Sequence, residues 1–154
     1  MLRYINYDIV FQEIPDEVTL AVNISCCPHR CAGCHSSHLQ EDIGETLDEN
    51  VLSVWLENYG NAITCLCFMG GDAEPHEVER LADYIRKKND RIKTAWYSGR
   101  ANLPADFSLV NFDYIKLGAY MEHLGGLNAP STNQRFFRIE KGKMIDRTSR
   151  FWKI

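Results

Sequence analysis

Several stretches of the chain combine apolar and β-branched residues in a way that predicts β-strands. The stretch at residues 62–69 (AITCLCFM) is apolar at both alternating sets of positions, which is typical of a central, parallel strand. The last part of the chain alternates around Lys141-Gly142-Lys143, as expected for a short hairpin. The predicted strands cover residues 18–24, 62–69, 92–97 and 112–117, and the hairpin covers residues 135–139 and 144–147.

Two helices are predicted between these strands. In the first, Thr46-Leu47-Asp48-Glu49 has the form of a capping box, with Thr46 as the cap, and Gly60 follows the last apolar position. The second ends in three basic residues, which favour the helix dipole at that position. The apolar stripes are Leu52, Trp55, Leu56 and Tyr59 in the first helix and Val78, Leu81, Ala82 and Ile85 in the second.

The alternation of strand and helix predicts an α/β fold with parallel strands joined by right-handed crossovers. A complete eight-fold barrel needs roughly 250 residues, and this chain has 154. We therefore expect one domain over residues 1–154, built as a short incomplete (βα) barrel or a curved, mostly parallel sheet. Ligands of such folds bind at the carboxyl ends of the strands.

Composition narrows the class of protein. Apolar residues make up 45% of the chain and charged residues 25%, as in ordinary globular proteins. A net charge of −4 gives no general attraction to nucleic acid or to an anionic membrane. The first residues lack the apolar core of a signal peptide, and the most apolar stretch is too short to span a bilayer. We expect a soluble, cytoplasmic protein.

The cysteines carry the most specific signal. Four of the six fall within nine residues, and Cys27, Cys31 and Cys34 have the spacing Cys-x3-Cys-x2-Cys. Three thiolates on one loop can hold three irons of a [4Fe–4S] cluster and leave the fourth iron open to a substrate. Cys65 and Cys67 alternate with large apolar residues inside a predicted strand, which favours a core position over a ligand role.

Other interpretations of the cysteine loop remain open at this stage. The three cysteines could form a structural zinc site together with His35 or His38, or they could be unliganded thiols. Cys26 could also take part in a shifted register, although its spacing to Cys31 is then x4.

The motifs together resemble those of a known family. Cys-x3-Cys-x2-Cys after the first strand resembles the signature of radical S-adenosylmethionine (SAM) enzymes, and Gly70-Gly71-Asp72 resembles their segment that receives the SAM amino group. Cys31-Ala32-Gly33-Cys34-His35, Trp96-Tyr97-Ser98-Gly99 and Ser131-Thr132-Asn133-Gln134-Arg135 are similar to the glycyl-radical activases that serve anaerobic ribonucleoside-triphosphate reductases. Because Ala73 and Glu74 follow Asp72 where the family has proline, both Asp72 and Glu74 are candidates for the acidic contact.

The resemblance implies an oxidoreductase that cleaves SAM reductively at a [4Fe–4S] cluster with one open iron. The resulting 5′-deoxyadenosyl radical would produce a glycyl radical on the large subunit of an anaerobic (class III) ribonucleotide reductase. It also implies a low-potential electron donor of the flavodoxin or ferredoxin type, and no nucleic-acid or membrane partner. The implied metal ligands, which are also the catalytic residues, are Cys27, Cys31 and Cys34, and the implied SAM-binding residues are Gly33, Cys34, His35, Gly70, Gly71, Asp72 and Ser98.

Two other functions are compatible with the sequence. The chain could be another small radical SAM enzyme that acts on a different glycyl-radical partner or on a small molecule, or it could be a zinc-stabilised binding module without catalysis. Lys116 could reach the same strand ends but is interpreted as a solvated lysine at the end of its strand. The segment 132–135 could close the site or contact the reductase, and the sequence does not distinguish these roles.

Overall fold

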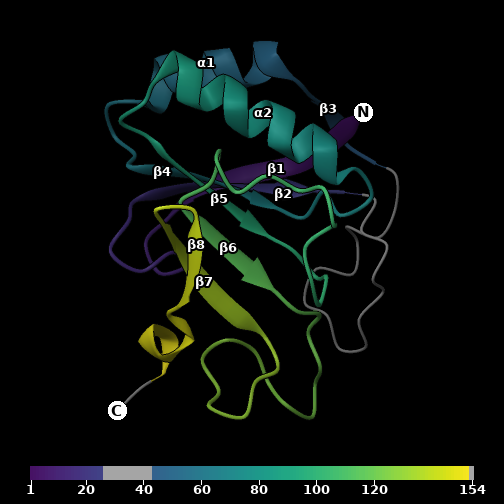
Figure 1. The fold of residues 1–154 in the computed structure, drawn as a ribbon. Coiled ribbons are helices and arrows are strands. Elements are labelled where there is room, and N and C mark those ends of the chain that lie inside the picture. The colour runs from purple at the N-terminus through teal and green to yellow at the C-terminus, as the bar shows by residue number, and fades with distance from the viewer. Residues whose placement is uncertain (26–42, 153–154) are drawn as a thin grey trace.

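The computed structural model describes residues 1–25 and 43–152. One mixed sheet of eight strands carries two α-helices on one face (Figure 1). The elements are β1 (Leu2–Val10), β2 (Thr19–Ile24), β3 (Glu45–Leu47), α1 (Glu49–Tyr59), β4 (Cys65–Met69), α2 (Pro75–Lys88), β5 (Lys93–Tyr97), β6 (Tyr114–Leu117), β7 (Arg135–Glu140), β8 (Lys143–Asp146) and the short 3₁₀ helix η2 (Thr148–Phe151).

The strand order is β3-β1-β2-β4-β5-β6-β7-β8. The four strands in the middle, β2, β4, β5 and β6, run parallel, as the sequence predicts. The strands on both sides pair antiparallel, so the sheet as a whole is mixed rather than mostly parallel. Two of these flanking strands, β1 and β3, were not predicted. Whether the sheet is an incomplete barrel of the radical SAM type stays a prediction.

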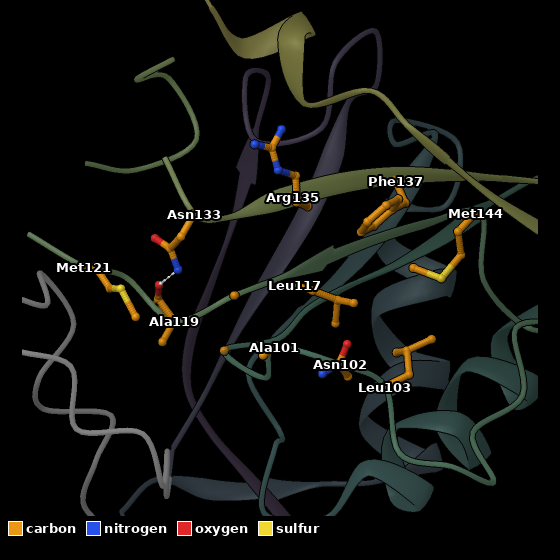
Figure 2. Close-up of a pocket in the computed structure, with 12 residues that line it drawn as sticks. Ala101, Asn102, Leu103, Leu117, Ala119, Met121, Asn133, Arg135, Phe137 and Met144 are labelled. Carbon is orange, nitrogen blue, oxygen red and sulfur yellow. Dashed lines mark hydrogen bonds between the residues drawn. The ribbon is translucent and has the colours of Figure 1, made fainter. Parts of the chain in front are cut away.

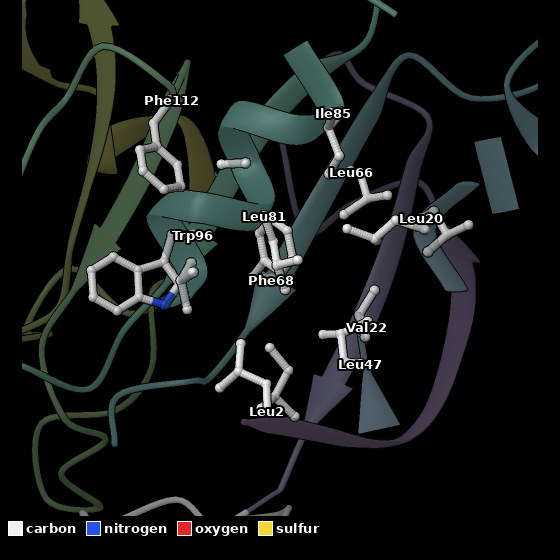
Figure 3. Packing of buried hydrophobic residues seen from close by; sticks show 14 of the residues in the cluster. Leu2, Leu20, Val22, Leu47, Leu66, Phe68, Leu81, Ile85, Trp96 and Phe112 are labelled. Carbon is white, nitrogen blue, oxygen red and sulfur yellow. The ribbon is translucent and has the colours of Figure 1, made fainter. Parts of the chain in front are cut away.

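Successive side chains along the parallel strands point to opposite faces of the sheet and form two separate apolar clusters. Leu66, Phe68 and Trp96 point toward the helices and pack with the inner faces of α1 and α2 (Figure 3). On the opposite face, Cys65 and Cys67 join a smaller cluster. Its other buried members are Ile14, Ala95, Tyr114 and Phe136. Burial on both faces confirms the predicted central strand, although β4 covers only Cys65–Met69 of the predicted residues 62–69.

The start of α1 differs from the prediction. Thr46 is not the helix cap, because it lies in β3 and pairs with Arg3 of β1 in extended conformation. Asp48 is the N-cap instead, and its side chain accepts a hydrogen bond from the backbone N–H of Val51 at 3.0 Å. The predicted stripe of α2 is confirmed, since Val78, Leu81, Ala82 and Ile85 are all fully buried.

Candidate cofactor site at the carboxyl ends of the strands

Residues 26–42 lie outside the described part of the chain, and with them Cys26, Cys27, Cys31, Gly33, Cys34 and His35. The residues that bracket this segment are described. Ser25, directly after β2, donates from its backbone N–H to the carbonyl of Arg3 at 2.9 Å and from its hydroxyl to the carbonyl of Ile43 at 2.5 Å. The cysteine segment therefore leaves and rejoins the fold at one point, at the carboxyl end of β2.

Gly70, at the end of the neighbouring strand β4, lies against the same point. A Cβ atom on Gly70 would lie 3.2 Å from the carbonyl oxygen of Ile24, the last residue of β2. The backbone N–H of Gly70 donates to the carbonyl of Tyr97 at 3.0 Å, and its own carbonyl accepts from Trp96 Nε1 at 2.7 Å. The end of β4 is thus fixed between the ends of β2 and β5, beside the start of the cysteine segment.

Gly71 is required by both conformation and space. Its φ is +91°, and a Cβ atom would lie 2.6 Å from Val78 Cγ2 in the core face of α2. We expect Gly71→Ala to lower the free energy of unfolding by about 2–4 kcal/mol through backbone strain and overpacking. Gly142→Ala is the matched control, because Gly142 has φ +75° with nothing within 4 Å. It should cost about 1 kcal/mol. Urea denaturation measures both, and equal losses would show that packing against Val78 plays no part.

Asp72 connects the ends of β4 and β5. Its carboxylate is buried, accepting from the hydroxyl of Ser98 at 2.5 Å and from the backbone N–H of Gly99 at 2.9 Å. Ser98 is fully buried, and its hydroxyl oxygen also accepts from the backbone N–H of Arg100 at 3.0 Å. The structure therefore brings Ser98 together with the consecutive residues Gly70, Gly71 and Asp72, from which it is distant in the sequence.

The second acidic candidate, Glu74, has a different environment. Its side chain is 41% exposed, and it forms an ion pair with the N-terminal ammonium of Met1. Glu74 also precedes α2 without capping it through its side chain. Asp72 is the carboxylate built into the strand ends, whereas Glu74 lies outside them at the protein surface.

Lys116 is not the solvated lysine that the sequence indicates. Its ammonium donates to the carbonyls of Ser98 and Gly118 at 3.0 and 3.1 Å, and it lies over the ring of Tyr97. The lysine thus places a positive charge between the ends of β5 and β6. It belongs to the same row of strand ends as Asp72 and Ser98.

The segment 132–135 is fixed beside β6. Thr132 and Gln134 are buried, and the Gln134 amide donates to the carbonyl of Gly118 at 3.2 Å. Asn133 donates from its side chain to the carbonyl of Ala119 at 2.9 Å. These bonds hold the chain that follows β6 at the carboxyl edge of the sheet.

A pocket of about 560 Å³ begins beside this edge, at Gly99 and Gly118 (Figure 2). Its walls are mainly apolar, and Arg135 contributes the only formal charge among its lining residues. The side chains that form the apolar wall are Leu103, Leu117, Met121, Phe137 and Met144.

Cys65 and Cys67 are core residues, as predicted. Both are fully buried, and desolvation raises the pKa of each thiol above its ordinary value. A raised pKa keeps them protonated, whereas a metal ligand must be a thiolate. Across residues 1–25 and 43–152 there is no group of three or more His, Cys, Asp or Glu side chains that could hold a metal ion.

A protein-family model described as a 4Fe-4S single cluster domain matches residues 17–104. The match covers more than half of the chain. It contains Cys27, Cys31 and Cys34, and it also contains Gly70 at the end of β4 and Ser98 at the end of β5. The chain belongs to the 4Fe-4S single cluster domain family. Membership supports an iron–sulfur cofactor for this cluster domain. Comparison with curated proteins and with solved structures found no match.

Some features of the candidate site are not visible in the sequence. The bond from Trp96 to the carbonyl of Gly70 and the anchoring of Lys116 depend on strands that are adjacent only in the folded sheet.

No helix in the described part of the chain is both long and apolar enough to cross a membrane.

Proposed function

We propose that this protein activates an anaerobic (class III) ribonucleotide reductase by reductive cleavage of SAM, generating a glycyl radical on the large subunit. The observation that carries the proposal is the buried contact between Asp72 and Ser98. It places an ordered, polar strand edge beside the point where the cysteine segment begins and ends. That arrangement fits a cofactor held by Cys27, Cys31 and Cys34 with SAM lying against the strand ends.

The described residues fit the implied cofactors in chemistry as well as position. Gly70, with φ +110° and no Cβ, lets the end of β4 lie close against the carbonyl of Ile24, beside the start of the cysteine segment. Asp72 supplies negative charge near the ammonium of the SAM methionyl group, and Ser98 positions that carboxylate through its hydrogen bond. Lys116 supplies positive charge suited to the SAM carboxylate.

When bound, a [4Fe–4S] cluster with one open iron supplies the electron for the cleavage of SAM. The chain's own contribution is to orient SAM and to exclude water from its reacting end. Low-potential electrons would come from a protein of the flavodoxin or ferredoxin type. A cytoplasmic location follows from this function and stays a prediction.

The test is anaerobic. Reconstituted protein is mixed with a reductant, SAM and the reductase large subunit, and the sample is examined by electron paramagnetic resonance. We expect a glycyl radical on the large subunit together with stoichiometric 5′-deoxyadenosine. Formation of 5′-deoxyadenosine without a radical on that subunit would favour another glycyl-radical partner or a small-molecule substrate. One bound zinc and no iron would refute the enzyme and favour a binding module.

A further inference from the structure

Charge is distributed unevenly along the chain. Residues 135–154 contain seven basic and two acidic side chains, whereas the preceding residues contain ten basic and nineteen acidic ones. The described elements of this basic region, β7, β8 and η2, lie beside one another and away from α1 and α2 (Figure 1). A protein with a negative net charge thus carries one compact basic unit, and such asymmetry is typical of a surface that binds an acidic partner.

Three arginines of this unit line one small hollow. Arg138 from β7, Arg147 after β8 and Arg150 from η2 surround a cavity of about 40 Å³. Tyr114 and Phe136 also line it, and both belong to the apolar cluster on the sheet face opposite the helices. Because Tyr114 begins β6, the hollow lies at the end of that strand away from Gly118 and the candidate cofactor site.

One carboxylate of the protein itself, that of Asp16, already lies at this hollow. Asp16 lines the hollow and forms an ion pair with Arg150 at 2.8 Å. Its backbone has φ +69°, which is uncommon for a residue other than glycine, and its side chain is 70% exposed. A carboxylate held in this way shows which chemical group the hollow accepts.

The arginines are not fully neutralised. Arg138 contacts Glu140 only through Nε at 3.3 Å, and Arg147 has no ion pair within the described ranges. Three guanidinium groups therefore line the hollow together with one carboxylate, that of Asp16, and Glu140 contacts Arg138 outside the lining. Guanidinium groups recognise carboxylates with paired, charge-assisted hydrogen bonds, so the hollow has capacity for a further carboxylate.

We propose that this arginine hollow, formed by Arg138, Arg147 and Arg150, binds glutamate or aspartate side chains of an acidic polypeptide segment on a partner protein. The negative charge of the rest of the protein would repel an extended nucleic-acid backbone. A short acidic segment avoids this repulsion because it contacts only the basic unit. A partner bound here leaves the strand ends near Asp72 and Ser98 accessible. The proposal is independent of the reaction proposed above.

The probe is fluorescein-labelled hexaglutamate, measured by fluorescence anisotropy with the full chain at low ionic strength. We expect the double variant Arg138→Gln/Arg147→Gln to bind it at least about tenfold more weakly, because two charged contacts are lost. The matched control, Lys141→Gln/Lys143→Gln, removes the same charge from the β7–β8 turn outside the hollow. It should change the affinity less than about threefold, since only long-range attraction is reduced.

Asp16→Asn provides a test in the opposite direction. Asparagine tolerates the left-handed backbone of this position but leaves Arg150 without its ion pair. Hexaglutamate should therefore bind about threefold more tightly or better, since competition by the internal carboxylate is removed. Unchanged or weaker binding by this variant would contradict the proposal.

Further outcomes would also overturn it. Equal weakening by the two double variants would show that general charge, and not the hollow, attracts the peptide. Displacement of the peptide by millimolar inorganic phosphate would indicate a phosphate site, and tighter binding of a single-stranded oligonucleotide would indicate a nucleic-acid surface. Circular dichroism of each variant confirms that the fold is retained.

Discussion

Cys31→Ala is expected to abolish SAM cleavage while leaving the chain partly folded. Two remaining thiolates in the Cys-x3-Cys-x2-Cys motif would hold a [4Fe–4S] cluster poorly, since only two of its four irons would then be anchored to the protein. Loss of an outer-shell partner alone lowers metal affinity or activity by about 10–100-fold, so loss of a direct ligand should lower cleavage by more. Anaerobic reconstitution, followed by iron analysis and quantification of 5′-deoxyadenosine, measures both effects.

Cys65→Ala is the matched control for this experiment. Cys65 is a fully buried core thiol, so its removal should reduce stability by about 1 kcal/mol and leave the iron content unchanged. Normal cleavage by Cys31→Ala would contradict the assignment of the cluster to Cys27, Cys31 and Cys34. A loss of iron in Cys65→Ala equal to that in Cys31→Ala would point to unfolding as the common cause.

Asp72→Ala is expected to weaken SAM binding by about 10–100-fold, or roughly 1.4–2.8 kcal/mol, with most of the iron retained. The substitution removes the buried carboxylate and leaves the Ser98 hydroxyl and the Gly99 N–H without that acceptor. The same loss should lower the free energy of unfolding by about 1–3 kcal/mol. Isothermal titration of reconstituted protein with SAM gives the affinity, and urea denaturation gives the stability.

Glu74→Ala serves as the control for Asp72→Ala. Its carboxylate is partly exposed and paired with the chain terminus, and exposed ion pairs contribute little. We expect SAM affinity within about twofold of the unaltered protein, less than 0.5 kcal/mol. The reverse order of effects would make Glu74 the acidic contact. Parallel loss of iron and SAM binding in Asp72→Ala would assign Asp72 a purely structural role.

Local patterns predicted most of the elements that form the core. The stripe of α2 and the two-sided burial of β4 both follow from which residues alternate, because burial selects apolar side chains at regular intervals. Such patterns do not predict β1 and β3. β1 mixes polar and apolar residues, most of them half-buried, and β3 has only three residues. The sequence around Thr46 matches a helix cap, but Thr46 pairs with β1 instead. Strand pairing in the folded sheet therefore determines its conformation.

The sequence by itself determined the chemistry that this protein has available: three closely spaced thiols, a Gly-Gly-Asp segment and apolar segments that form strands. Spacing along the chain is sufficient for these because each depends on neighbouring residues. Only the tertiary structure decided that Asp72 bonds to Ser98 and that Lys116 is anchored at the same edge. It alone brought Asp16 to Arg150. Those contacts join residues from separate strands and loops, and the packing of the sheet, not any local pattern, determines which of them meet.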